Sequence, residues 1–286
     1  MDRSVSDTTA KSRVMPAHDG STSGKPDDAT RRAIADSLAR ARLARAPIDP
    51  ISAHHPDLTV DDAYAIQLSQ IATRKGEGRR ILGHKIGLTS AAMRRQLGVG
   101  EPDYGHLLDD MLFGEADPIA LGEFIAPRAE PEIAFVLKRP LAGPGVDASE
   151  ARAAVDYAVA AIEIIDSRIR DWKIGLVDTV ADNASSGGYV LGSRRTRIDS
   201  VDLRLVGCVL TRGGSVVGTG AGGAVLGSPL DALVWLANAV GRHGVSLEPG
   251  HVVLSGAVCA AVPIVAGDTV TATFATLGSV TARFTP

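Results

Sequence analysis

Residues 127–137 read Pro-Arg-Ala-Glu-Pro-Glu-Ile-Ala-Phe-Val-Leu. The run is short, and its second half is apolar, so we predict a β-strand here. Side chains alternate between the two faces of a strand, so one face carries Glu130, Glu132, Ala134 and Val136. The other face carries Ile133, Phe135 and Leu137. The predicted strand therefore holds two acidic side chains on one face of an otherwise apolar run.

Similar short apolar runs continue from Arg80 to the C-terminus, separated by glycine-rich turns. Residues 212–215 (Arg-Gly-Gly-Ser) lie between two β-rich runs and predict a hairpin turn. Many strands with few helices favour an α+β protein built around a large β-domain. The predicted strands lie within residues 81–83, 133–137, 189–191, 203–206, 251–254, 269–274 and 280–284.

Two helices are expected between these strands. One begins at Asp147 and runs through Val155 and Val159. The other has Ser228 as its N-cap and Pro229 at its first position, and it ends near Gly241 or Gly244.

The N-terminal part has the sequence pattern of helices instead of short strands. Ile34, Leu38 and Ala41 recur with the spacing of one helix face, and a second helix begins at Thr59, with Asp62 placed as in a capping box. Before them, a segment rich in Ser, Thr, Asp, Gly and Pro has too few bulky apolar residues to order itself. The expected organisation is a disordered tail (1–27), a helical subdomain (28–79) and a metal-binding β-domain (80–286).

Composition excludes several classes of protein. The chain has 286 residues, of which 45% are hydrophobic and 22% charged, as in ordinary globular proteins. Only 4% are aromatic and the net charge is −3, which argues against a nucleic-acid partner. No uncharged stretch approaches the length of a membrane span, and the first residues do not form a signal peptide. Cys208 and Cys259 lie in apolar runs, which indicates free thiols in a cytoplasmic protein.

Common cofactor motifs are absent or incomplete. Residues 218–223 contain G-x-G-x-x-G, but Pro229 interrupts the helix that a dinucleotide site requires, so we interpret the motif as a tight turn. There is no phosphate-binding loop, no nucleophile elbow and no zinc-ligand spacing. His54 and His55 lie in a polar loop and indicate a solvated pair.

The acidic residues carry the chemistry. Glu130 and Glu132 repel each other on one strand face unless a positive group compensates them, and a hard cation such as Mg²⁺ or Mn²⁺ would do so. Glu163 lies inside the apolar run 160–166, so we do not expect it to be an ordinary exposed surface residue. Three carboxylates could hold a six-coordinate ion and leave positions for water or a chelating substrate.

Other interpretations of these acids stay open. Glu130 and Glu132 could be a solvated pair at a strand end, held by Arg128. If residues 160–166 form a helix, Asp166 shares a face with Glu163 and could join the site. If they form a strand, Asp166 has another role, such as pairing with Arg168.

Two further segments look like parts of a site. Lys85 lies between glycines in an apolar strand, where it could stabilise an enolate or move a proton, unless it is a solvated strand-end lysine. Residues 178–188 gather small and polar side chains in one loop, suited to substrate contacts or to an ordinary turn.

Together these segments resemble the 2-oxopent-4-enoate (2-hydroxypenta-2,4-dienoate) hydratase family of the fumarylacetoacetate hydrolase superfamily. The resemblance covers roughly residues 30–286. It rests on several long motifs in the same order, which are residues 83–90 (Gly-His-Lys-Ile-Gly-Leu-Thr-Ser), 101–109, 127–137, 163–174, 178–188 and 267–284.

The resemblance implies a metal-dependent lyase with a curved, mixed β-barrel-like core and peripheral helices. Glu130, Glu132 and Glu163 match the family's metal ligands, and the metal would be Mg²⁺ or Mn²⁺. Lys85 and Asp103 match its catalytic residues. Ser185 lies in its active-site loop. The implied reaction ketonises a 2-hydroxy-2,4-dienoate and adds water at C4, giving a 4-hydroxy-2-oxo acid.

Related activities and assemblies are also implied. The 4-oxalocrotonate decarboxylases share the metal site and much of residues 180–186, whereas residues 102–105 and 171–174 look more like the hydratases. Hydratases of hexadienoates and heptenedioates are similar too, so the substrate's chain length stays open. Family members form homo-oligomers, often pentamers or decamers. A non-catalytic partner of a pathway decarboxylase or aldolase is the other class, although the intact acids and Lys85 argue against it.

Overall fold

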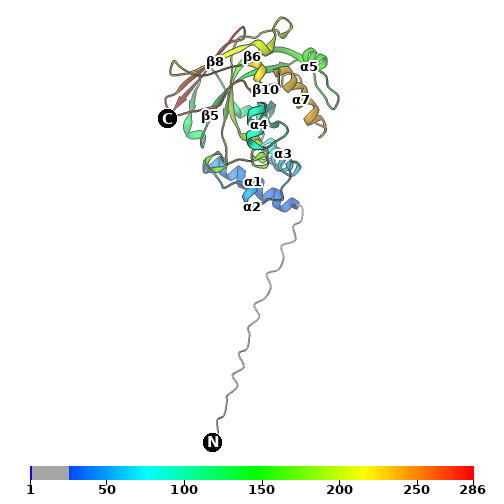
Figure 1. The fold of residues 1–286 in the computed structure, drawn as a ribbon, viewed down its shortest axis with the longest axis vertical. Helices are drawn as coiled ribbons and strands as arrows, with labels where there is room; N and C mark the ends of the chain where they lie inside the picture. Colours follow the sequence, from blue (N-terminus) through cyan, green and yellow to red (C-terminus); the bar gives the residue numbers. More distant parts are fainter. Residues whose placement is uncertain (2–25) are drawn as a thin grey trace.

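The computed structural model describes Met1 and residues 26–286, and the fold is a mixed α+β arrangement around a curled sheet (Figure 1). The predicted fold class is confirmed. The sequence-based expectation for residues 1–27 falls almost entirely outside the described residues.

The large sheet forms the body of the molecule. Both parallel and antiparallel neighbours occur, because β1 pairs with β10 in parallel and β5 pairs with β6 in antiparallel orientation. A short strand, β11 (Val262–Pro263), also pairs with β5. The strand order is β2 (Asp103–Leu108), β1 (Ile81–Gly87), β10 (Val252–Ala257), β5 (Arg128–Leu137), β6 (Val155–Ile165), β7 (Ser186–Leu191) and β3 (Leu112–Phe113).

A second, smaller sheet shares an apolar core with one face of the large sheet. Ile162 and Ile164 of the large sheet and Val280 and Phe284 of the small one belong to this core. The predicted hairpin turn is confirmed, since Gly213 and Gly214 both have positive φ between the last two strands. The strand order is β4 (Pro118–Ala120), β13 (Gly278–Thr285), β12 (Thr269–Phe274), β8 (Gly207–Arg212) and β9 (Ser215–Ala221).

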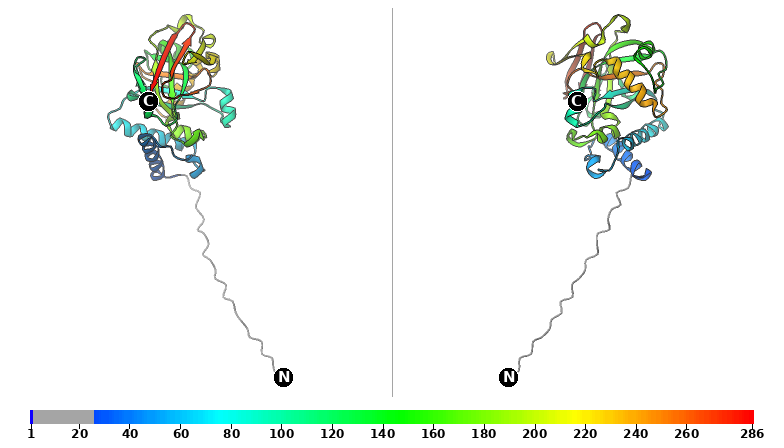
Figure 2. Two further views of the ribbon diagram at one scale, coloured as in Figure 1. Left: turned by 90° about the vertical axis from the view of Figure 1, so that its left-hand side faces the viewer. Right: turned by 45° about the vertical axis from the view of Figure 1, so that its right-hand side comes forward.

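Three N-terminal helices gather at one end of the molecule (Figures 1 and 2). They are α1 (Asp28–Ala44), α2 (Ile51–His54) and α3 (Val60–Gly76). The helix predictions are confirmed, and Thr59 and Asp62 form the expected capping box. Their apolar faces share a cluster with Val180 and Ala181 from the second half of the chain. The division into a subdomain (28–79) and a β-domain (80–286) stays a prediction.

Four more helices connect the strands: α4 (Ala91–Leu97), α5 (Ala148–Ala154), α6 (Leu176–Ala181) and α7 (Pro229–Gly241). Ser228 caps α7 as predicted. Short 3₁₀ helices are η1 (Asp109–Met111), η2 (Leu121–Glu123), η3 (Arg170–Trp172), η4 (Asn183–Ser185), η5 (Ile198–Ser200), η6 (Leu203–Leu205) and η7 (Gly222–Ala224).

Residues Gly222–Gly241 are long and apolar enough, by composition alone, to cross a membrane. In the structure this stretch is divided, because η7 ends at Ala224 and α7 begins at Pro229. Helix α7 buries Leu233 and Leu236 completely in the core. The apolar character of the segment is therefore that of a core helix.

Three local predictions are wrong. The helix from Asp147 ends at Ala154, because β6 begins at Val155 and pairs with strands on both sides. Residues 203–206 form η6 instead of a strand, and the side chain of Asp202 caps this turn. Gly218 and Gly220 lie within β9, where a Cβ atom on Gly220 would lie 2.0 Å from the Val258 carbonyl oxygen. The close approach of the Val258 backbone therefore explains why residue 220 is a glycine.

Candidate functional site

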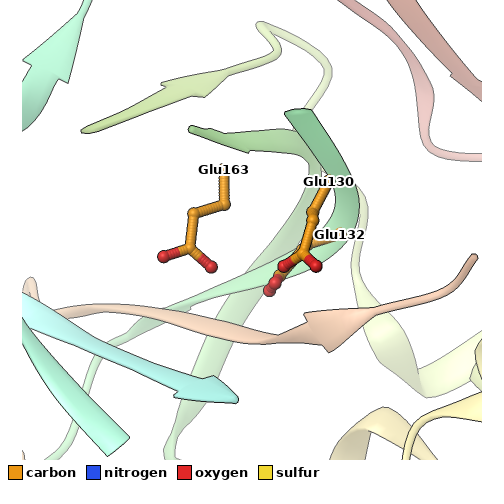
Figure 3. Close-up of side chains that lie close together, drawn as sticks. All are labelled: Glu130, Glu132 and Glu163. Carbon is orange, nitrogen blue, oxygen red and sulfur yellow. The ribbon is translucent and has the colours of Figure 1, made fainter. Parts of the chain in front are cut away.

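The three predicted acidic residues meet on one face of the large sheet. In the β5–β6 ladder, Glu130 lies directly opposite Glu163, and Glu132 is two residues further along β5. Their carboxylate groups turn toward one another (Figure 3), and one oxygen from each lies within 4.8 Å of the others. The strand interpretation of residues 160–166 is confirmed, and its helical alternative is wrong.

These carboxylates are buried with little compensation from hydrogen bonds. Glu132 and Glu163 are fully buried and Glu130 is half-buried. The Gly256 N–H donates to Glu132 Oε2 at 2.7 Å. Within the described residues, Glu132 Oε1 and both oxygens of Glu163 have no hydrogen-bond partner. Buried oxygens without partners are the donor set that a hard divalent cation requires, so these residues fit Mg²⁺ or Mn²⁺.

Crowding of these groups changes their protonation. Burial, and then the charge of Glu163, raises the pKa of Glu130 to about 7. Burial and the neighbouring glutamates also raise the pKa of Glu132. Burial raises the pKa of Glu163 against the opposing effect of Lys85. A bound divalent cation would reverse these shifts, because it favours the ionised carboxylates.

Lys85 reaches this cluster from β1. Its side chain is buried, its Nζ donates to the Ala184 carbonyl oxygen at 3.0 Å, and the same atom lies 3.3 Å from Glu163 Oε2. Burial lowers the pKa of Lys85, but Glu163 and Asp103 outweigh it, and the net shift is upward. Lys85 is therefore a charged, buried group and not the solvated strand-end lysine of the alternative interpretation.

Asp103 lies beside Lys85 on the neighbouring strand, opposite Gly87. Thr179 Oγ1 donates to Asp103 Oδ2 at 3.1 Å, and Oδ1 has no partner among the described residues. A Cβ atom on Gly87 would lie 2.1 Å from Asp103 Oδ1 and 3.3 Å from Lys85 Nζ. Only glycine leaves room for both charged groups. Burial raises the pKa of Asp103 despite Lys85, which suits it to hold a proton.

Ser185 lies in a strained turn against the same site. Asn183, Ala184 and Ser185 all have positive φ, at 53°, 51° and 53°. Ser185 is buried, and its Oγ lies 3.5 Å from Thr179 Oγ1. Non-glycine residues avoid this conformation, and their clustering is typical of functional sites. The turn also supplies the Ala184 carbonyl oxygen that binds Lys85.

Sequence reasoning missed two supporting residues, Thr179 and Asn183. The expected single loop 178–188 is wrong, because Thr179 lies on α6 and points at Asp103. The Asn183 side chain donates to the His106 carbonyl oxygen and accepts from the His106 N–H, and so ties the turn to β2. The small, polar composition of this segment was the only signal available.

The role suggested for Asp166 is also wrong. Its carboxylate accepts from the Ile125 and Ala126 N–H groups. Arg168 instead forms a buried ion pair with Asp182. The guanidinium of Arg128 does not hold the glutamates as an ion pair but stacks over the Trp172 ring, 4.4 Å from its centroid.

The raised glutamate pKa values predict a pH-dependent response to metal. In the metal-free protein these carboxylates contribute stability below their ordinary pKa of 4.5, and it is lost as pH rises through about 7, the folded-state pKa of Glu130. A cation should relieve that loss. We expect the rise in Tm caused by saturating Mg²⁺ to be several degrees larger at pH 8 than at pH 5.5. Thermal unfolding with and without Mg²⁺ measures this, and equal shifts at both pH values would contradict it.

Comparison with known proteins shows which family this chain resembles. A sequence model of the fumarylacetoacetate (FAA) hydrolase C-terminal domain matches residues 90–285. A 2-keto-4-pentenoate hydratase of Paraburkholderia xenovorans (strain LB400) is 49% identical over 254 residues, 89% of this chain and 94% of the relative. A 2-hydroxyhexa-2,4-dienoate hydratase of Comamonas testosteroni is 42% identical over 238 residues, 82% of this chain and 90% of the relative.

A solved structure extends the comparison to the whole fold. The 4-oxalocrotonate decarboxylase of Pseudomonas putida G7, complexed with magnesium and adipate, has a TM-score of 0.88 and 38% identity to this chain. The match covers 91% of this chain and 99% of the decarboxylase. The resemblance deduced from the sequence motifs is thus confirmed. The chain belongs to the 2-keto-4-pentenoate hydratase family of the fumarylacetoacetate hydrolase superfamily.

Proposed function

We propose that this chain is a metal-dependent hydratase that converts a 2-hydroxy-2,4-dienoate into a 4-hydroxy-2-oxo acid. The observation that carries the proposal is the cluster of Glu130, Glu132 and Glu163, with Lys85 Nζ 3.3 Å from Glu163. This cluster occurs in a chain that is 49% identical to a 2-keto-4-pentenoate hydratase. Such a reaction belongs to the meta-cleavage breakdown of aromatic compounds or of steroid rings.

The three glutamates are the proposed ligands of Mg²⁺ or Mn²⁺. When bound, such an ion supplies charge stabilisation to the carboxylate and 2-oxygen of the substrate and makes the conjugated chain a better electrophile. Gly256 orients Glu132 through its N–H, and Lys85 orients Glu163. These contacts leave the remaining carboxylate oxygens free to bind the cation.

The proton transfers are assigned to Lys85 and Asp103. Ketonisation removes the proton from the 2-hydroxyl and adds one at C5, and hydration then places OH on C4 and H on C3. Lys85 Nζ is positioned to stabilise negative charge on the 2-oxygen. Asp103 Oδ1, buried and without a hydrogen-bond partner in the described part of the chain, is positioned to give and take the protons at carbon. Ser185, in the turn of residues 183–185, is proposed to make a polar contact with the substrate.

A decarboxylase is the second candidate. The solved 4-oxalocrotonate decarboxylase matches 91% of this chain with a TM-score of 0.88, so the same scaffold holds that enzyme. In that reaction the cation would stabilise the enolate left by loss of CO₂. Product analysis separates the two, because hydration adds the mass of one water and decarboxylation releases gas.

We also infer a soluble, cytoplasmic protein that assembles as a homo-oligomer, a pentamer or a decamer, and that could contact a pathway decarboxylase or aldolase. A purely non-catalytic partner would not need a metal. Substituting Glu132 with alanine would leave the assembly of such a partner, and the activity of the enzyme it stabilises, unchanged.

The test is an assay on protein stripped of metal by a chelator. 2-Hydroxypenta-2,4-dienoate generated in place absorbs in the ultraviolet, and we expect its absorbance to fall only after Mg²⁺ or Mn²⁺ is added. Mass spectrometry should find a product one water heavier. CO₂ release from the dicarboxylate analogue without hydration would favour the decarboxylase, and no reaction with either metal would refute both catalytic assignments.

A further inference from the structure

One cation beside the site has no role in the account above. Arg128 lies on the same strand face as Glu130 and Glu132, two residues before Glu130 and so about 7 Å from it along β5. Within residues 26–286, no carboxylate lies within ion-pair distance of Arg128, and no acceptor binds its side-chain N–H groups. A guanidinium has five such donors, so Arg128 is open to an anion.

The guanidinium is nevertheless held in place. It stacks on the ring of Trp172, whose Nε1 donates to the Ala126 carbonyl oxygen at 3.0 Å. Asp171 and Trp172 both have φ of 57°, a backbone conformation that non-glycine residues rarely adopt and that occurs often at functional sites. A stacked guanidinium keeps its edge free for two parallel hydrogen bonds to a carboxylate.

Burial along the site face shows which end of it lies closer to solvent. Arg128 and Glu130 are half-buried, whereas Glu132 is fully buried. Beyond Glu132, the buried side chains of Ala134, Val159 and Leu254 close the inner end. An acid bound at the glutamates therefore extends toward Arg128.

Charge points the same way. With a divalent cation in place and Asp103 holding its proton, the positive charges of the cation and Lys85 only balance the three glutamates. Lys85 is already engaged by Glu163 and Ala184. The site therefore has no surplus positive charge for an anionic substrate, and a further cation at its less buried end supplies one.

We infer that Arg128, held by Trp172, binds a carboxylate of the substrate at the less buried end of the site. The inference rests on the proposed function and identifies the group that recognises a 2-oxo acid there. The carboxylate is either the one next to the 2-oxygen, present in every substrate of this class, or the far carboxylate of a dicarboxylic acid.

Two acids that cannot be hydrated test this, because they separate binding from turnover. 2-Oxopentanoate and 2-oxoadipate lack the double bond, and the second has a far carboxylate. Calorimetric titration of the Mg²⁺-loaded protein measures their affinities. We expect Arg128→Gln to weaken binding about 10- to 100-fold, the range for a charge-assisted pair. Arg128→Lys should recover part of the loss, because charge returns without the planar fork.

The pattern of losses identifies the carboxylate. Equal weakening of both acids assigns Arg128 to the carboxylate next to the 2-oxygen, and weakening of 2-oxoadipate alone assigns it to the far one. Unchanged affinity for both acids in Arg128→Gln overturns the inference. So does a loss of Mg²⁺ affinity that accounts for the whole effect. If the hydration assay fails but Arg128→Gln still binds these acids more weakly, the proposed reaction is refuted and the role of Arg128 is not.

Two controls separate recognition from packing. Arg195 stacks on Tyr157 at 4.8 Å, toward the other end of β6, and Arg195→Gln removes a similar stack without approaching the site. It should leave both affinities unchanged. Trp172→Leu should weaken binding only when Arg128 is present, so its effect and that of Arg128→Gln should not add. Additive losses would show that Trp172 does not act through Arg128.

Discussion

Replacing Lys85 with methionine is expected to lower turnover by about 10²- to 10⁴-fold while Mg²⁺ still binds. The methionine fills a similar volume but cannot donate to the Ala184 carbonyl oxygen or stabilise charge on the substrate. Steady-state kinetics at saturating Mg²⁺ measure the loss, and calorimetry measures the metal affinity.

The same variant has a second readout. In the metal-free protein Lys85 is the cation next to buried Glu163, and removing one member of a buried pair costs about 3 kcal/mol or more of folding free energy. Mg²⁺ should restore much of that loss, because it supplies the missing positive charge. Near-normal turnover would remove Lys85 from the mechanism, and normal turnover with normal metal-free stability would also contradict the ion pair.

Glu132→Gln is expected to weaken Mg²⁺ binding by at least about 100-fold and to lower turnover with it, because an anionic ligand becomes a neutral one. The amide oxygen can still accept from the Gly256 N–H, so the fold should persist. At limiting Mg²⁺ the rate should fall most, and excess metal should recover part of it.

Stability should respond in the opposite direction from that of the lysine variant. Burial and the charges of Glu163 and Glu130 disfavour the ionised form of Glu132, so its neutral replacement should raise or preserve the Tm of the metal-free protein at pH 8. The Tm increase caused by Mg²⁺ should be largely lost. Unchanged metal affinity and turnover at limiting Mg²⁺ would exclude Glu132 as a ligand. If Lys85→Met lowers the stability of the metal-free protein and Glu132→Gln does not, Glu132 acts as a metal ligand and Lys85 as the positive charge that compensates Glu163.

Local pattern was sufficient for much of this protein. The period of two along a strand placed Glu130 and Glu132 on one face, and the structure agrees. Cap residues predicted the starts of α3 and α7, where side chains satisfy the first free N–H groups. Where local signals competed, they failed. The helical spacing after Asp147 predicted a helix that continued through Val155. Pairing with β5 and β7 instead makes the chain from Val155 onward a strand.

The sequence by itself determined the fold class, the family and the identity of the acidic residues, because alternation, capping and motif order are properties of neighbouring residues. Tertiary structure alone decided how these residues meet. Strand register places Glu163 opposite Glu130, and Asp103 opposite Gly87, whose missing Cβ leaves room for the carboxylate. Register depends on the pairing of segments far apart in the chain, and a shift of one residue would turn each of these side chains to the other face. The positive φ angles of residues 183–185 likewise depend on tertiary contacts that no local pattern encodes, among them the hydrogen bonds that tie Asn183 to β2 and Lys85 to the Ala184 carbonyl oxygen.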